Sequence, residues 1–171
     1  MQHKKAFFNN VNELIAYLYT KVGSLSPLKL QKGLYFLYAY YSAMYGIKHA
    51  NEESESDYNL PEELFSAEFE AWNYGPVIRS VYMDRKLGED KYQEMARKFD
   101  ADLFFNDDNG KEVKSFIDDL FSQISKASDF SLVDRSHEDK AWENAFSQGK
   151  STIIPNQAII DEYKTKFARK Q

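Results

Sequence analysis

The densest group of ionisable side chains in this sequence lies at residues 134–139 and consists of Asp134, His137, Glu138 and Asp139. A histidine beside carboxylates can act as a general base or as one ligand of a metal ion. The chain has only 3 histidines, and none has a second histidine at the spacing that a metal site needs. We therefore expect a structural, hydrogen-bonded role for His137, and no bound metal or other cofactor.

A second acidic string, NDDNG at residues 106–110, contains the glycine that an EF-hand calcium loop carries at its sixth position. Counting from Gly110 puts Phe105 first and Phe116 last in such a loop, where carboxylates are required. The string therefore predicts a solvated turn. The chain also has no cysteine, no glycine-rich phosphate loop, no nucleophile elbow and no zinc-protease helix signature. We expect a protein that is not an enzyme.

The string WNYGP at residues 72–76 places an indole and a phenol beside a sharp break in the chain. Aromatic residues before a Gly-Pro turn usually pack that turn onto the core, which gives Gly75 and Pro76 a structural role. Exposed aromatic and arginine side chains are also typical of the residues that dominate binding energy in protein interfaces. The two interpretations are compatible. The candidate anchors for a partner are Trp72, Tyr74, Arg79 and Tyr82.

Charge is distributed unevenly along the chain, whose net charge is −5 and whose isoelectric point is near 5.3. Residues 49–78 include no Lys or Arg but eight acids, among them Glu52, Glu53 and Glu55. Such a run is most often a solvated face, but it can also steer a basic partner such as a nuclease. The basic residues at 164–170 form only a short tail, so we expect no strong binding to nucleic acid.

Composition and length limit the class of protein further. The chain has 171 residues, of which 43% are hydrophobic and 16% aromatic, and this is enough for one well-packed domain. Asparagines at residues 9, 10 and 12 interrupt what would be the apolar region of a signal peptide. The charge-free stretch from Gly33 to Ile47 is shorter than the roughly 20 apolar residues that cross a bilayer. We expect a cytoplasmic protein without a membrane segment, which the lack of cysteine also favours.

Apolar residues recur at helical spacing along most of the chain. The pattern predicts a helix at 11–22 and a second one that begins at Pro27, with Ser26 as its N-cap, and ends at Gly46. Because the second helix is apolar nearly all round, we expect it at the centre of the fold. A further helix is predicted from Pro76, with Val77, Ile78, Val81 and Tyr82 on one apolar face. Other helices are predicted over 113–124, 129–133 and 139–146, and from Pro155 or Asn156 onward, while 85–108 shows no clear period.

Two segments have the character of strands. Residues 65–72 alternate between apolar and polar, and residues 151–154 are the best candidate to pair with them. The expected fold is therefore mainly α: a single compact helical domain over residues 1–171 with a small two-stranded β hairpin or ribbon. Trp142 lies on the apolar side of the predicted helix 139–146, and we expect it in the core.

Three segments resemble the Panacea domain antitoxins, also described as SocA-like antitoxins or phage-associated GepA-like proteins. The segments are LKLQKGLYFLY at 28–38, FSAEFEAWNYGPVIRSVY at 65–82 and LVDRSHEDKAWENAF at 132–146. The middle segment is the most specific, because an alternating strand that ends in Ala-Trp-x-Tyr-Gly-Pro-Val is an unusual string. Small departures are Gly33 in place of a larger apolar residue, Ser136 in place of Thr and Ala141 in place of Pro.

The resemblance implies a domain that neutralises the toxin of a toxin–antitoxin pair by direct binding, and in some relatives similar proteins deliver the toxin to a protease. The expected partner is then a cognate toxin, bound around residues 65–82 and steered by the acids of residues 52–70. Two alternatives remain, a DNA-binding regulator of prophage or mobile-element origin and a hydrolase centred on His137. A basic stripe on one helix would favour the regulator, and a deep pocket with His137 and carboxylates the hydrolase.

Overall fold

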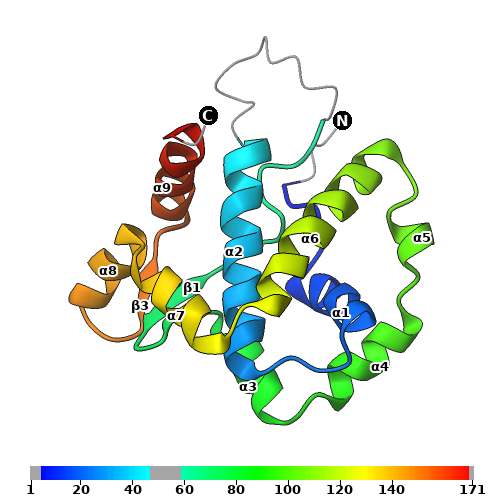
Figure 1. The fold of residues 1–171 in the computed structure, drawn as a ribbon, viewed down its shortest axis with the longest axis horizontal. Helices are drawn as coiled ribbons and strands as arrows, with labels where there is room; N and C mark the ends of the chain where they lie inside the picture. The colour runs from blue at the N-terminus through cyan, green and yellow to red at the C-terminus, as the bar shows by residue number, and fades with distance from the viewer. Residues whose placement is uncertain (1–4, 47–58, 170–171) are drawn as a thin grey trace.

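The computed structural model describes residues 5–46 and 59–169, and these residues form nine helices and three short strands (Figure 1). The mainly helical class that the periodicity predicts is confirmed. Glu52, Glu53 and Glu55 lie outside the described residues. In the part of the chain that is described, no helix has the length and apolar character needed to cross a membrane.

Helix α2 (Pro27–Tyr45) runs through the middle of the molecule, as Figure 1 shows. The Ser26 hydroxyl caps it by accepting a hydrogen bond from the backbone N–H of Lys29 at 3.1 Å, and Gly46 ends it, as predicted. The helices that pack on it are α3 (Arg79–Lys86), α6 (Asp108–Lys126), α7 (Asp129–His137) and α9 (Asn156–Arg169). Because neighbours surround α2, 13 of its 19 residues are buried, which explains its nearly all-round apolar pattern.

Gly33 lies where α6 approaches α2. A Cβ atom at this position would meet Cγ2 of Ile124 at 3.6 Å, an ordinary van der Waals contact. The structure thus leaves room for a Cβ atom at this position, where the sequence departs from the family pattern.

Helix α1 (Val11–Lys21) and helix α4 (Asp90–Lys98) lie side by side, and the short helix α5 (Ala101–Phe104) follows α4. Both α4 and α5 lie in the segment 85–108, where the sequence shows no clear period. In α4 only Tyr92 is buried, with its ring 5.5 Å from that of Tyr19 on α1, while Met95 and Ala96 are partly buried against the core. Helix α5 has only 4 residues. Such short helices with few apolar residues give little periodic signal in the sequence.

The three strands form one small sheet in the order β2-β1-β3. Strand β1 (Phe69–Trp72) pairs antiparallel with β2 (Gly75–Val77) and with β3 (Thr152–Ile154). The predicted pairing of residues 65–72 with 151–154 is confirmed, although the strand covers only the second half of the alternating segment.

The prediction of a helix that begins at Pro76 is wrong. Residues 75–77 instead form β2, a third strand that sequence analysis did not predict, and α3 begins only at Arg79 after Ile78 as N-cap. A proline at residue 76 suits an edge strand as well as a helix start, because neither position needs the backbone N–H that proline lacks. The two-residue turn at 73–74 decides between them by folding Pro76 back onto Ala71.

Helix α7 begins after its N-cap Ser128 and continues beyond the predicted end at Val133 to His137. Helix α8 (Lys140–Ser147) follows at once, with Asp139 as its N-cap residue. Trp142 of α8 is 9% exposed and belongs to the hydrophobic core. The ionisable group at 134–139 therefore spans the junction between two helices.

Candidate interaction surface

The turn between β1 and β2 presses against the body of the protein at Gly75. Its φ angle is 109°, a left-handed conformation that residues with a side chain rarely adopt. A Cβ atom at Gly75 would lie only 2.4 Å from the hydroxyl oxygen of Ser136 and 2.8 Å from Cε of Lys32. Both the backbone angle and the lack of space therefore require glycine, and the turn packs directly on α7 and α2.

Two polar side chains of α2 bond to the backbone of β2 and of Ile78, the residue that follows it. The Gln31 amide accepts a bond from the Ile78 N–H at 2.9 Å and donates one to the Ile78 carbonyl at 3.1 Å. The Lys32 Nζ donates to the Pro76 carbonyl at 2.9 Å. Because β2 is an edge strand, these bonds occupy backbone groups that the edge would otherwise leave open. The turn and the start of α3 are thereby attached to the central helix.

Lys32 is completely buried, and among the described residues it has no carboxylate partner. Burial lowers its pKa to about 7. A buried ammonium with a single carbonyl acceptor is unfavourable, so the residue costs stability whenever it is charged. We interpret Lys32 as a positioning residue for the turn above it.

The side chains on the outer side of the turn form a hydrogen-bonded network. Arg79 donates through Nε and Nη2 to the two carboxylate oxygens of Glu70 at 2.9 and 2.8 Å, and the Trp72 indole N–H donates to the same carboxylate at 3.0 Å. The bond from Arg79 lowers the pKa of Glu70, which keeps the carboxylate ionised. The guanidinium carbon of Arg79 also lies 5.3 Å from the centroid of the Trp72 ring. A bidentate pair of this kind fixes both side chains.

We define the aromatic patch as Trp72, Tyr74, Arg79 and Tyr82, the four anchors that the sequence predicts. Tyr74 is 58% exposed, the Arg79 side chain 56% and Tyr82 36%, while Trp72 is half-buried. Trp72 and Tyr82 meet edge to face with ring centroids 4.9 Å apart. The structure thus brings Trp72, Arg79 and Tyr82 together and places Tyr74 on the adjoining turn.

The apolar face predicted for the helix after Pro76 is divided between the core and the surface. Val81 faces the core and Tyr82 lies on the outer side of α3 against Trp72. Ile78, the N-cap residue of α3, is buried together with Val81.

His137 and Trp142 support the patch from below. The His137 Nε2 lies 2.8 Å from the Asn73 carbonyl, and its ring stacks on the Trp142 indole with centroids 4.4 Å apart. The Trp142 indole N–H donates to the Trp72 carbonyl at 2.9 Å. Both residues therefore hold the backbone of the β1–β2 turn, and within the described residues His137 has no bond to a carboxylate or hydroxyl.

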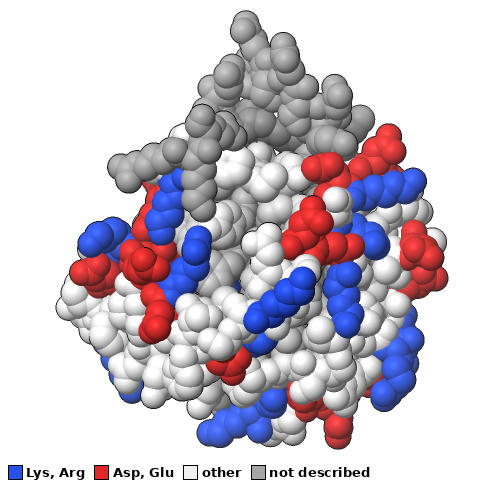
Figure 2. All heavy atoms as spheres, viewed as in Figure 1, with Lys and Arg blue, Asp and Glu red and all other residues white. Residues whose placement is uncertain are grey.

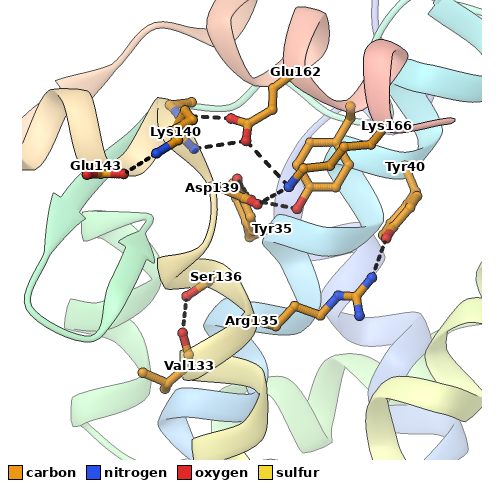
Figure 3. A network of polar contacts seen from close by, with 12 residues as sticks. Tyr35, Tyr40, Val133, Arg135, Ser136, Asp139, Lys140, Glu143, Glu162 and Lys166 are labelled. Carbon is orange, nitrogen blue, oxygen red and sulfur yellow. Dashed lines mark hydrogen bonds and ion pairs between the residues drawn. The ribbon is translucent and has the colours of Figure 1, made fainter. Parts of the chain in front are cut away.

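Asp139 has other partners than His137, and Figure 3 shows its carboxylate close to Tyr35 and Lys166. Its carboxylate is 1% exposed and accepts hydrogen bonds from the hydroxyls of Tyr35 and Tyr163 and from the ammonium of Lys166. We call these four residues the Asp139 network. Burial and the nearby carboxylate raise the pKa of both tyrosines well above the ordinary value, so both hydroxyls remain donors. The acidic group at 134–139 is thus divided between two separate structural roles.

The acids that are described do not form one free negative patch. Glu63 accepts a bond from the Tyr38 hydroxyl at 2.6 Å, and Glu70 is occupied by Arg79 and Trp72. Lys166, in the basic C-terminal segment, is bonded within the Asp139 network. On the face drawn in Figure 2, basic and acidic side chains lie among one another rather than in a stripe of one sign.

The described residues include no group of three or more side chains that could hold a metal ion. The string at 106–110 begins α6, with the Asp107 side chain accepting from the Gly110 N–H at 2.6 Å. A hollow of about 450 Å³ lies between α1, α4 and α5, where its apolar lining includes Phe99, Leu103 and Phe104. His137 does not line this hollow.

Sequence reasoning missed the two α2 side chains that carry the turn, Gln31 and Lys32. The available signal was their polarity, because they interrupt an otherwise apolar stretch at the centre of the fold. It also missed Glu70 as the partner of Arg79, having counted it among the acids that steer a partner.

A comparison with known protein families matches residues 30–143 to the model of the antitoxin SocA-like, Panacea domain. The matched range contains most of α2, the β1–β2 turn, α3, α7 and the start of α8, which together build the aromatic patch and its support. Searches of curated proteins and of solved structures found no match.

Proposed function

This chain belongs to the SocA-like antitoxin family defined by the Panacea domain, and from that premise we propose that it neutralises a cognate toxin protein by binding it directly. We further propose that it acts in the cytoplasm, without enzymatic activity and without a metal or cofactor. The origin that suits this role is a prophage or another mobile element. The toxin would be encoded beside this chain.

The aromatic patch is the observation that supports this proposal. Tyrosine, tryptophan and arginine are the residues most often found where binding energy is concentrated. Here Tyr74, Arg79 and Tyr82 are exposed around the half-buried Trp72. They are also held in place before any partner arrives, by the Glu70 carboxylate and by the turn that Gly75 attaches to α2 and α7. Such preorganisation reduces the entropy lost on binding.

The first test is rescue of growth from the toxin encoded by the adjacent reading frame. Wild-type protein is expected to restore growth, and folded Tyr74→Ala and Arg79→Ala proteins are expected to fail. Matched controls are Phe130→Ala, at a residue that is 65% exposed, and Arg97→Ala, which removes an exposed arginine paired with Glu94. If the two patch variants neutralise the toxin as well as the controls do, the toxin binds elsewhere.

Direct neutralisation and delivery to a protease differ in what happens to the toxin. We propose direct neutralisation, so toxin abundance measured by immunoblot is expected to stay constant while growth recovers. Loss of the toxin only in the presence of this protein, reversed by deletion of the host protease, would favour the adaptor role instead.

The DNA-binding regulator makes an opposite prediction. With a net charge of −5, the protein is expected to bind DNA only weakly and to lose that binding as salt rises. A footprint at one defined sequence at physiological salt would support the regulator in place of the antitoxin.

A further inference from the structure

Helix α3 carries a second row of exposed side chains beside the aromatic patch. Met83 is 54% exposed and Leu87, directly after the helix, is 90% exposed. Together with Arg79, Tyr82 and Lys86 they follow the spacing i, i+3, i+4, i+7 and i+8, which places them on one side of a helix. A surface helix normally turns apolar side chains such as Met83 and Leu87 toward the core. Here Val81 faces the core, and the larger stripe faces outward.

The charges around this stripe are balanced with one exception. Arg79 is paired with Glu70, Asp84 with Lys91 at 2.9 Å, and Arg85 with Glu89 at 3.7 Å. The ammonium of Lys86 lies 5.9 Å from the centroid of the Tyr82 ring. Within the described part of the chain, Lys86 has no carboxylate partner.

A partner that covers the stripe would bury the ammonium of Lys86. A charge removed from water without a counter-charge is strongly unfavourable, so the partner has to supply a carboxylate at this point. Around that point it has to supply apolar side chains, because Met83 and Leu87 flank Lys86 with apolar surface.

We propose that the outer face of α3, defined as Tyr82, Met83, Lys86 and Leu87, binds an acidic amphipathic segment of the toxin. A carboxylate of that segment pairs with Lys86, and its apolar side chains cover Met83 and Leu87. This inference rests on the proposed function and extends the aromatic patch along α3. The acids of residues 52–70 would attract a basic part of the toxin, whereas the outer face of α3 requires an acidic one.

The hollow between α1, α4 and α5 can be compared with the outer face of α3, because it too has apolar residues beside a lysine. Its lysine, Lys98, already has Glu94 as a partner at 3.5 Å. Covering the hollow therefore does not require a carboxylate from outside. Leu103 at its edge is 69% exposed, similar in type to Leu87. The two places thus provide matched pairs of residues for one experiment.

The test uses the full-length protein and the purified product of the adjacent toxin gene, with the dissociation constant measured by biolayer interferometry. Lys86→Glu and Leu87→Ser are each expected to weaken binding at least tenfold. The matched variants Lys98→Glu and Leu103→Ser are expected to change it less than twofold. A photo-crosslinking amino acid in place of Met83 is expected to label a toxin segment with more Asp and Glu than Lys and Arg.

The outcomes separate this inference from the proposed function. Failure of wild-type protein to bind the toxin overturns both. If the wild type binds the toxin and Lys86→Glu and Leu87→Ser bind it with unchanged affinity, the inference alone is overturned. Tighter binding by Lys86→Glu, or crosslinking of residue 83 to a basic segment of the toxin, would also overturn it. Stronger effects of Lys98→Glu and Leu103→Ser would assign the toxin to the hollow. Reversal of the matching carboxylate to lysine in the toxin is expected to restore binding to Lys86→Glu.

Discussion

The aromatic patch and the Asp139 network contain the same kinds of residue but have different structural roles. Each has a carboxylate that binds a cation and an aromatic side chain: Glu70 with Arg79 and Trp72, and Asp139 with Lys166 and two tyrosines. In the aromatic patch the Arg79 side chain is 56% exposed. In the Asp139 network the Lys166 side chain is 39% exposed, and both tyrosines are buried.

The difference shows that residue type alone does not decide between binding and stability. Asp139 joins α2 and α9 to the start of α8, and its bonding capacity is used inside the protein (Figure 3). The Glu70 carboxylate also bonds internally, but it serves to hold Arg79 and Trp72 at the surface. Among the described residues Nη1 of Arg79 has no hydrogen-bond partner, whereas Nε and Nη2 are bonded to Glu70.

Trp142→Ala is expected to have the largest effect, because this residue links the patch to the core. Removal of a buried tryptophan costs about 3–5 kcal/mol, out of a total that is roughly 5–15 kcal/mol for a domain. It also removes the bond to the Trp72 carbonyl and the stacking partner of His137. Chemical denaturation measures the loss, and a wild-type unfolding midpoint would show that the patch does not depend on this support.

Asp139→Asn is expected to lower the unfolding free energy by about 2–3 kcal/mol. The loss is smaller than for a fully buried ion pair, because the ammonium of Lys166 still pairs with the carboxylate of Glu162 at 3.4 Å. Toxin affinity of the folded variant is expected to stay the same, since the network lies apart from the patch. Denaturation and binding measured on one preparation test both statements. A variant of normal stability that no longer binds toxin would reverse the assignment of the two regions.

Lys32→Met tests how the patch is attached to α2, through the pH dependence of stability. The folded pKa of Lys32 is about 7 and the unfolded one is near 10.4, so between these values only the unfolded state holds the proton. Stability of the wild type is therefore expected to rise with pH from 7 to 9.5, with a slope of up to about 1.4 kcal/mol per pH unit from this group.

The Lys32→Met protein should lack that slope, which urea midpoints at pH 7, 8 and 9 can show. Below pH 7 both states of the wild type are protonated, so the two stability curves should run parallel there. Parallel curves over the whole range would mean that Lys32 keeps its charge in the folded protein.

Arg79→Ala is expected to raise the dissociation rate of the toxin about tenfold, equivalent to about 1.4 kcal/mol, because it removes a fixed anchor. Since this change also leaves the Glu70 carboxylate without its cation, Arg79→Lys serves as a control that keeps the charge but loses the bidentate geometry. Surface plasmon resonance separates the two rates. An unchanged dissociation rate in a folded Arg79→Ala protein would remove Arg79 from the interface.

Charge reversal of Glu52, Glu53 and Glu55 is expected to have the smallest effect. Peripheral charges mainly alter the association rate, so a severalfold slower association at low salt is expected if a basic toxin surface faces these acids. Faster association would agree instead with the acidic segment inferred for the outer face of α3. Either result sharpens the contrast between steering charges and fixed anchors.

Much of the fold follows from periodicity in the sequence. The central position of α2, its Ser26 cap and the α6 stripe were predictable because apolar residues at a helical spacing have to face a core. The pairing of β1 with β3 was predictable because a lone strand needs a partner. The third strand was missed because proline at residue 76 suits two structures, and only the turn before it selects one.

What the sequence determined by itself was the mainly helical class, the family resemblance and the candidates for the surface, since these depend on residue types and local spacing. What the tertiary structure decided was how those candidates are connected. Glu70 and Arg79 are nine residues apart, Lys32 and Pro76 are separated by 44, and Tyr35 and Asp139 by 104. No local pattern encodes such contacts, because burial and hydrogen bonding between distant segments arise only when the helices pack. The fold therefore settled that Asp139 is held inside and that Arg79 faces out.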